Sequence, residues 1–339
     1  MKRKSLGIAL LLAMVVFLAA CGIKEQPEKT TANVPKELQS VRVASWSQPI
    51  TEQTNLLVDQ EKGFFKEKGL QVTFVPGAGG GDAIKNILTG QADIAFTDPG
   101  SLYFALDKGE KLRVIYNIYP QNVFNVVSLK ENKITRPEDL KGKKIGVYSL
   151  ASGTRQNLLV LLNQVGLSEQ DVTIVETGLL NFAPLMQGQV DATAATDTGL
   201  LIGKQKGLGE VDVMEVKDYL NVPSDIFVVT EKTYQEKQEL IREFLAGYRN
   251  SSQWMLENPE EAAALAVKYA IDGKEAKRNI EIIKLRNAAS VSPDTEKKGL
   301  GALDVSILQQ GADTYKNLGL ISNSLDMSQV VSQDLSPTK

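Results

Sequence analysis

Two threonine–aspartate pairs in similar surroundings are the residues whose types and spacing most suggest chemistry in this chain. The stretch LTGQADIAFTDPG (88–100) contains Thr97-Asp98, and the stretch MQGQVDATAATDTG (186–199) contains Thr196-Asp197. One carboxylate from each stretch would suit a ligand with N–H donors, such as an ammonium or aminopyrimidine group. Such a carboxylate would be a poor partner for nitrate or sulfate, because two negative charges brought together away from water are costly. Asp and Thr also cap helices, so capping is the alternative role of both pairs.

The segment SGTR (152–155) is the sharpest local indication of a ligand-binding turn. Ser152 is a natural N-cap, and the amides and dipole of the helix that follows favour a negative group. Thr154 and Arg155 would add a hydroxyl and a positive charge, and Gly153, between Ser152 and Thr154, is included among the candidates. The alternative is simple capping, with Arg155 solvated at the surface.

The glycine-rich segment GAGGGD (77–82) resembles a phosphate loop only in part. It lacks the Gly-Lys-Ser/Thr ending that places a lysine on phosphates. We therefore expect a turn in which the backbone of Gly79 and Gly80 approaches a ligand or the sheet, rather than a nucleotide site.

The composition excludes several classes of function. The chain has 339 residues, 38 Lys and Arg, 41 Asp and Glu, no His and one Cys. Without histidine there is no Ser-His-Asp or Cys-His catalysis and no imidazole metal site. The acidic balance argues against nucleic acid as a partner, because phosphate binding requires a basic face. We expect neither a metal nor a cofactor.

The N-terminus reads as an export signal (1–20). Three basic residues at 2–4 precede the apolar run LGIALLLAMVVFLAA, the pattern of a secretory signal peptide. Cys21 follows Leu-Ala-Ala, which resembles the lipobox of bacterial lipoproteins, where the cysteine receives lipid. A plain signal peptide with an incidental Cys is the alternative. Residues 21–40 are polar and read as a flexible tether, so we expect a protein held by lipid outside the cytoplasmic membrane.

Strands and helices alternate along the chain and then restart. Residues 41–45 and 70–76 read as strands, GAGGGD opens a helix, and ADIAF is a further strand. The order repeats from KKIGVYS through the apolar helix 152–166 to QVDATAATDTG. Such alternation predicts α/β architecture with two lobes, in which ligands bind beyond the carboxyl ends of the strands. After residue 234 we expect mainly helices, which pack against the rest of the protein and carry no chemistry.

Five segments of the chain resemble those of a known protein family. EKGFFKEKGLQVTFVP, GQADIAF, EDLKGKKIGV, GLSEQDV and GQVDA occur in the order typical of the NMT1/THI5-like family, and the resemblance runs from about Val41 to Leu320. That family includes nitrate, sulfonate, taurine and thiamine-precursor binding proteins of ABC importers. The resemblance implies a two-lobed class II periplasmic-binding-protein fold that closes by hinge motion. Lobe one would be 41–128 plus 226–320, lobe two 129–225, and 321–339 a C-terminal tail.

The resemblance also adds candidates for ligand contact. Trp46 follows the first strand at a position similar to the family's first ligand-contacting turn, where it could stack a ring or cover an alkyl chain. The remaining candidates are Ser45, Gln48, Asn181, Phe182 and Thr198.

Three functions are compatible with these sequence features. The first is a monomeric, lipid-anchored solute receptor that delivers an aliphatic sulfonate or taurine-like, or a pyrimidine or thiamine-precursor-like, solute to an ABC permease with its cytoplasmic ATPase. Nitrate is less favoured. The second is an enzyme of pyrimidine synthesis, but the eukaryotic members with that activity use an active-site histidine, which this chain lacks. The third is a sensor or adhesion lipoprotein without transport.

Overall fold

The computed structural model describes residues 37–336, apart from the side chain of Leu180. The expected signal peptide, Cys21 and most of the expected tether lie outside the described residues. The first strand already begins at Gln39, inside the segment expected as a tether.

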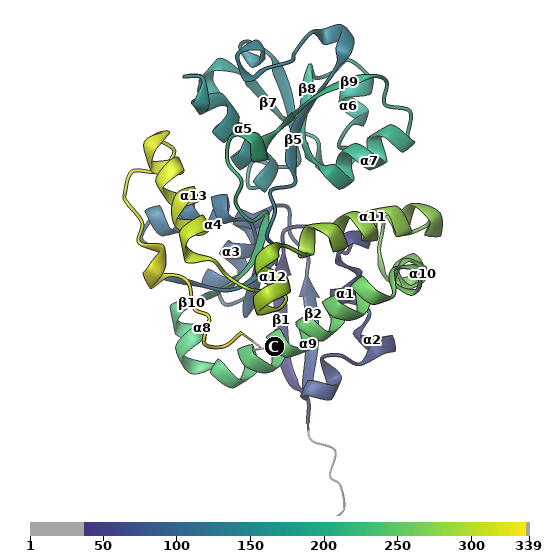
Figure 1. The fold of residues 1–339 in the computed structure, drawn as a ribbon, viewed down its shortest axis with the longest axis vertical. Coiled ribbons are helices and arrows are strands. Elements are labelled where there is room, and N and C mark those ends of the chain that lie inside the picture. Colours follow the sequence, from purple (N-terminus) through teal and green to yellow (C-terminus); the bar gives the residue numbers. More distant parts are fainter. Residues whose placement is uncertain (1–36, 337–339) are drawn as a thin grey trace, which may run out of the picture. The chain divides into compact units, whose positions relative to one another are not determined.

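Two five-stranded sheets organise the described residues (Figure 1). Sheet A has the order β2-β1-β3-β10-β4, and sheet B has the order β7-β6-β8-β5-β9. In each sheet the first three strands are parallel to one another and the last two pairings are antiparallel. The strands of sheet A are β1 (Gln39–Ser45), β2 (Leu70–Val75), β3 (Ile94–Thr97), β4 (Leu112–Tyr119) and β10 (Asp225–Thr230). Those of sheet B are β5 (Phe124–Leu129), β6 (Lys144–Val147), β7 (Thr173–Glu176), β8 (Ala192–Thr196) and β9 (Val211–Glu215).

The helices divide between the two sheets. Sheet B is accompanied by α5 (Gly153–Gln164), α6 (Ala183–Met186) and α7 (Asp197–Gln205) (Figure 1). The helices that accompany sheet A are α1 (Thr54–Leu57), α2 (Asp59–Lys62), α3 (Gly80–Leu88), α4 (Pro99–Asp107), α8 (Glu231–Glu236), α9 (Gln238–Glu257), α10 (Pro259–Tyr269), α11 (Ala276–Ser290), α12 (Pro293–Lys298) and α13 (Val305–Asn317). We call sheet A with its helices the first lobe and sheet B with its helices the second lobe. The expected two-lobed α/β class is confirmed.

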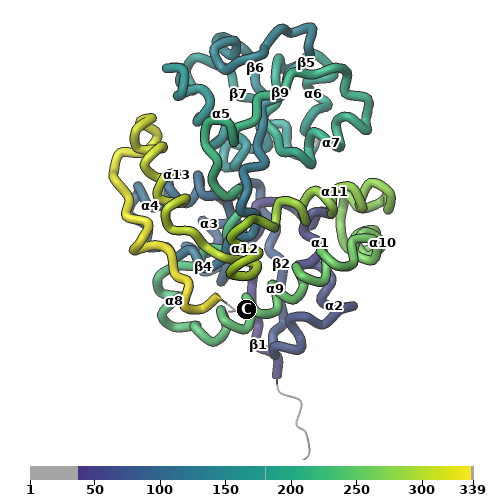
Figure 2. The backbone as a smooth tube through the Cα atoms, viewed as in Figure 1, coloured from purple at the N-terminus to yellow at the C-terminus, as the bar shows by residue number. Residues whose placement is uncertain are grey.

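The chain crosses from the first lobe to the second between β4 and β5 and returns between β9 and β10 (Figure 2). All five strands of sheet B therefore lie between the two crossings, and sheet A is completed by β10 after the return. The boundary expected at residue 128 is wrong, because β5 pairs with β8 and β9 and belongs to the second lobe. The apolar sequence of 112–129 carries no mark of this change of sheet, since both strands are buried.

The expected polar tail from residue 321 is also wrong. This segment packs along the first lobe: the amide of Val114 donates to the carbonyl of Val330 at 3.0 Å, and the amide of Ser332 donates to the carbonyl of Val114 at 2.9 Å. Met327 and Leu335 are buried there. The apolar anchors are irregularly spaced among polar residues, so neither helix nor strand periodicity reveals them.

The Gly-Gln-x-Asp sequence shared by the two stretches, at residues 90–93 and 188–191, has a structural role. Gly90 and Gly188 have φ of 71° and 66°, the left-handed conformation that ends α3 and α6. Three residues later, the carboxylate of Asp93 accepts the backbone N–H of Arg42 at 2.9 Å. In the second lobe Asp191 accepts that of Lys144 at 2.8 Å. Each aspartate thus ties the start of a central strand to the neighbouring strand.

These two aspartates differ in their partners, and we expect different stability effects. Asp93 also pairs with the side chains of Arg42 and Lys237, whereas the carboxylate of Asp191 bonds the Lys144 amide. We expect Asp93→Ala to lower the free energy of unfolding by about 2–3 kcal/mol and Asp191→Ala by about 1 kcal/mol, measured by urea unfolding. Equal losses would contradict this explanation.

The pH dependence of this pair of variants follows from the same contacts. Although burial works against it, hydrogen bonds from Arg42 and Lys237 hold the pKa of Asp93 below its usual range. The stabilisation by Asp93 is therefore fully present above its unfolded-state pKa of about 4 and disappears as the pH falls through the folded-state pKa. The difference between wild type and Asp93→Ala should shrink in acid.

Candidate functional site

A small cavity of about 40 Å³ lies between the two lobes. It is bounded by turns at the carboxyl ends of parallel strands, where ligands bind in open α/β sheets, and by the first residues of β5 and β10. Its first-lobe lining consists of Trp46, Gly79, Gly80, Asp98 and Asp225. Its second-lobe lining consists of Phe124, Tyr148, Ser152, Gly153, Thr154 and Thr196.

The glycine turn before α3 brings the backbones of the two lobes together. The amide of Gly79 donates to the carbonyl of Trp46 at 2.7 Å, and the amide of Gly81 donates to the carbonyl of Ala151, in the second lobe, at 2.9 Å. The hydroxyl of Ser149 donates to the carbonyl of Ala78. A Cβ on Gly79 would lie 2.5 Å from the carbonyl oxygen of Ala151, so only glycine permits this approach. The structure therefore shows the two lobes in contact, in a closed arrangement around the cavity.

Asp98 is both a helix cap and part of the cavity wall. Its carboxylate accepts the backbone N–H of Ser101 at 2.8 Å and the Ser101 hydroxyl at 2.7 Å, which caps α4. Burial raises the pKa of Asp98 above its ordinary value, although the bonds from Ser101 work in the other direction. Its Cγ lies 3.2 Å from where a Cβ of Gly153 would stand. The carboxyl of the first lobe thus faces the N-terminus of α5 in the second.

Asp225, which is not among the residues predicted from the sequence, contributes a second carboxyl to the cavity. It begins β10 at the return crossing and is 6% exposed. Within residues 37–336, its side chain makes no hydrogen bond or ion pair. Burial raises the pKa of Asp225 well above its ordinary value, and the negative charges of Asp98 and Glu52 raise it further. Nothing in the segment SDIFVVT marks this role, because an aspartate before a buried strand is most simply a turn residue.

Aromatic rings form the other walls. Trp46 and Tyr148, from opposite lobes, meet edge to face with ring centroids 6.2 Å apart and an interplanar angle of 89°. Phe124 closes a further side, and it packs so closely on Gly153 that a Cβ there would lie 2.7 Å from its ring. The Nε1 of Trp46 is buried and has no hydrogen-bond partner among the described residues. The walls therefore suit a flat ring with a polar edge.

Ser152 occupies the N-cap position of α5, but its side chain does not cap the helix. The Ser152 hydroxyl donates instead to the carbonyl of Ser149 at 2.6 Å and lies 2.7 Å from the Thr154 hydroxyl. Thr154 in turn accepts the backbone N–H of Tyr148 at 2.9 Å. The expected side-chain cap is wrong because the preceding turn supplies closer partners. These hydroxyls fix the turn that carries Tyr148.

Arg155 does not lie at the cavity. Its guanidinium pairs with Glu169, and it faces an outer groove that contains Lys85 and Glu110. Neither lysine nor arginine lines the interlobe cavity among the described residues. The positive charge that was expected beside the SGTR turn is therefore neutralised elsewhere.

Seven of the predicted positions line the cavity: Trp46, Gly79, Gly80, Asp98, Ser152, Gly153 and Thr154. The other predicted positions do not line it. Ser45 bonds the side chain of Gln53, Thr97 donates to the carbonyl of Gly80, and Phe182 is buried in the core of the second lobe. Gln48, Asn181 and Thr198 do not line the cavity either.

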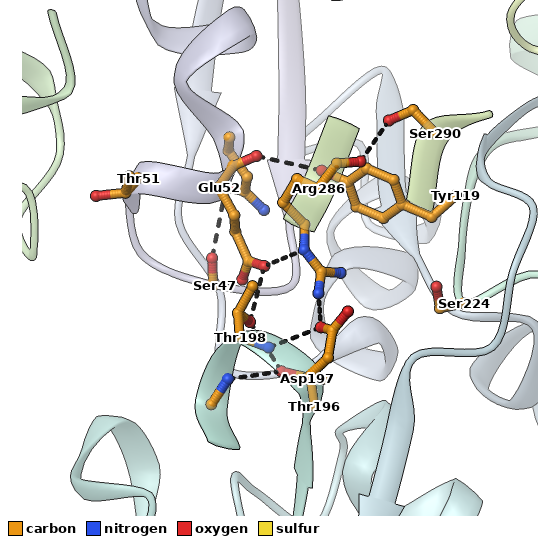
Figure 3. A network of polar contacts seen from close by, with 12 residues as sticks. Ser47, Thr51, Glu52, Tyr119, Thr196, Asp197, Thr198, Ser224, Arg286 and Ser290 are labelled. Carbon is orange, nitrogen blue, oxygen red and sulfur yellow. Dashed lines mark hydrogen bonds and ion pairs between the residues drawn. The ribbon is translucent and has the colours of Figure 1, made fainter. Parts of the chain in front are cut away.

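The second threonine–aspartate pair is used differently from the first. In α7 the cap is Thr196, whose hydroxyl accepts the N–H of Gly199 at 3.3 Å. Asp197 is then the first helical residue and pairs with Arg286 of the first lobe (Figure 3). The second stretch has one more residue between its two aspartates than the first. The cap consequently moves from the aspartate to the threonine, and Asp197 does not line the cavity.

Comparison with known proteins identifies one family and several related binding proteins. A model of the family described as NMT1/THI5 like matches residues 50–262. The riboflavin-binding protein RibY of Chloroflexus aurantiacus is 23% identical over 98% of this chain and 97% of its own length. The formylaminopyrimidine-binding protein of Halalkalibacterium halodurans is 26% identical over 76% of this chain and 77% of its own length.

A solved structure shows the same fold. The alkanesulfonate-binding protein SsuA of Xanthomonas axonopodis pv. citri, bound to MOPS, superposes with a TM-score of 0.67 at 16% identity. The match covers 88% of this chain and 99% of that chain. The two-lobed arrangement described above is thus that of solute-binding proteins.

Proposed function

Because this chain belongs to the NMT1/THI5-like family, we propose that it is an extracytoplasmic solute-binding protein of an ABC importer whose ligand is a small heteroaromatic ring with N–H donors. An aminopyrimidine related to the thiamine precursors is the ligand class that we favour. The ligand would lie between the lobes and be delivered to a permease on opening.

The observation that carries this proposal is the pair of buried carboxyls without a cation. Asp98 and Asp225 both line the cavity, and Lys and Arg are missing from its lining. A carboxylate in a desolvated site needs a hydrogen-bond donor or a positive charge. An exocyclic amino group supplies N–H donors, and a protonated ring nitrogen supplies a donor together with a positive charge. The rings of Trp46 and Tyr148 provide surfaces for the ring itself.

The same features disfavour a bare anion. The N-terminus of α5 would normally attract a sulfonate or nitrate. Here the carboxyl of Asp98 already lies against Gly153 at that helix end, and Arg155 is paired with Glu169. An anion would therefore enter beside two carboxyls without a compensating charge. A taurine-like zwitterion would offer its ammonium to Asp225 but would still place its sulfonate near Asp98.

The size of the cavity supports a small ring over a flavin. About 40 Å³ holds a few water molecules, since one water occupies roughly 10–15 Å³ on this measure. A single six-membered ring requires a modest separation of the lobes, whereas an isoalloxazine with its ribityl chain requires a far larger one.

We propose that this cavity binds its ligand without catalysing a reaction. The chain has no histidine, and no lysine lines the cavity to form a Schiff base. Among residues 37–336 there is no group of three or more His, Cys, Asp or Glu side chains that could hold a metal. In the same range, no helix is long and apolar enough to cross a membrane. For attachment to the membrane we propose lipid at Cys21, because the preceding Leu-Ala-Ala resembles a lipobox.

A thermal-shift experiment tests the ligand class. We expect 4-amino-5-hydroxymethyl-2-methylpyrimidine at millimolar concentration to raise the melting temperature, as linkage requires for a ligand of the folded form. The same ring without its amino group should produce a much smaller shift. Taurine, methanesulfonate and nitrate should produce none. Stabilisation by a sulfonate but not by the aminopyrimidine would overturn the proposal.

A further inference from the structure

We propose that Arg286 and Asp197 form an interlobe latch that favours the closed state of the cavity. The latch would regulate the proposed binding site by favouring closure of the lobes. Its biological purpose depends on the proposed function, but its existence does not. Its residues lie outside the cavity lining, and its test requires no ligand.

Arg286 is held in place by the first lobe before it meets the second. It lies on α11, and its side chain is 1% exposed. Its Nε is 3.2 Å from Oε2 of Glu52, and its guanidinium lies over the ring of Tyr119 at 5.3 Å from the centroid. Glu52 and Tyr119 both belong to the first lobe. The guanidinium is therefore fixed in position by its own lobe (Figure 3).

The remaining end of the guanidinium reaches the second lobe. Nη2 of Arg286 pairs with the carboxylate of Asp197 at the start of α7. Figure 3 shows Arg286 between Glu52 and Asp197. One ion pair of this arginine lies within a lobe and the other joins two lobes. Opening the cleft would break the pair with Asp197 and leave the pair with Glu52 intact.

Two further polar contacts accompany this pair along the same interface. The Thr198 hydroxyl of α7 donates to Oε2 of Glu52 at 3.3 Å. At the other end of α7, the Gln205 side chain donates to the carboxylate of Glu281 on α11. Helix α7 of the second lobe thus makes polar contacts with both Glu52 and α11 of the first lobe, which suits an interface that separates repeatedly.

The latch is adjacent to the cavity through one threonine. Thr196 lines the cavity, and its hydroxyl lies 3.0 Å from that of Thr198, which bonds Glu52. A ligand that contacts Thr196 would therefore lie next to the elements that carry the latch. Because Thr196 and not Asp197 caps α7, the aspartate is free for this role.

Asp197→Asn tests the latch with little disturbance of either lobe. The variant keeps the Thr196 cap and leaves Arg286 paired with Glu52, so no buried charge is left alone. Glu169→Gln is the matched control: it also neutralises the carboxylate partner of an arginine, but Arg155 and Glu169 both lie in the second lobe. Spin labels at Lys206 of the second lobe and Lys277 of the first, both exposed, report the separation of the lobes. Cys21→Ser removes the native thiol.

Pulsed electron paramagnetic resonance without ligand measures the distribution of distances between the two spin labels, and so the fractions of open and closed molecules. We expect Asp197→Asn to raise the ratio of open to closed molecules about tenfold, a typical size for a coupling of this kind. Glu169→Gln should keep the wild-type distribution. An unchanged distribution in Asp197→Asn, or equal changes in both variants, would overturn the latch. Either result leaves the ligand class untouched, because the thermal-shift experiment decides that separately.

Discussion

Replacement of Asp225 by asparagine is expected to stabilise the unliganded protein and to remove most of its affinity for an aminopyrimidine. The carboxyl is 6% exposed, makes no hydrogen bond within the described part of the chain and lies near two other acidic groups. A neutral amide avoids the cost of that buried charge, which we expect to add about 1–2 kcal/mol to the free energy of unfolding at neutral pH. Loss of the charge-assisted bond to the ligand should weaken binding about 10–100-fold.

The pH dependence of the stability gain distinguishes this explanation from simple repacking. Burial raises the folded-state pKa of Asp225 above its unfolded value. Relative to the amide, the native carboxyl is therefore least costly below the unfolded-state pKa of about 4, and the cost develops as the pH rises through the folded-state pKa. The advantage of Asp225→Asn should consequently grow from acid to neutral pH.

Urea unfolding and calorimetric titration of the same preparations measure both effects. Asp218→Asn is the control, since Asp218 is exposed in the short turn before β10 and undergoes the same chemical change. We expect this control to alter neither stability nor affinity by a measurable amount. Retained affinity in Asp225→Asn would show that this carboxyl does not contact the ligand.

Gly79→Ala is expected to prevent closure while both lobes remain folded. A Cβ at this position would lie 2.5 Å from both the carbonyl carbon and the carbonyl oxygen of Ala151, and 2.8 Å from the nitrogen of Ser152. These are backbone atoms of the second lobe and cannot move aside as a flexible side chain does. The lobes would have to stay apart, so the ligand would contact one lobe only. We expect affinity to fall by at least about 100-fold, because half of the contacts are lost.

Backbone strain alone must be separated from this clash. Gly79 has φ of +136°, so alanine is strained there even without the second lobe. Gly63→Ala is the matched control: Gly63 has φ of +72°, and no atom lies within 4 Å of its Cβ position. Both variants should lose about 1–2 kcal/mol of stability. Only Gly79→Ala should lose the ligand-induced rise in melting temperature and show a larger radius of gyration in solution scattering.

The sequence predicted the lobes and much of the cavity because its signals there are local. The alternation of strands and helices, the glycine turn at 77–82 and the SGTR turn each follow from short-range rules of propensity and capping. Turns after parallel strands meet at one edge of a sheet, so Trp46, Gly79 and Asp98 could be expected together without knowledge of any contact. That Thr154 of the other sheet lies opposite them was implied by the resemblance to two-lobed binding proteins.

Contacts between distant residues could not be predicted in this way. Arg155 looked available to a ligand, and only the position of Glu169 in space shows that it is occupied. Asp225 lies at a crossing between the lobes, where its burial depends on both. The two threonine–aspartate pairs read alike, yet one extra residue moves the cap and directs Asp197 to Arg286, which is 89 positions later in the chain.

The central claim is that the cleft selects an N–H-bearing ring and excludes anions. Isothermal titration of the purified protein with 4-amino-5-hydroxymethyl-2-methylpyrimidine, in the presence of a large excess of taurine, tests it most directly. We predict saturable binding with one site per chain and an affinity that taurine does not change. Absence of binding by the pyrimidine, or its displacement by taurine, would contradict the claim.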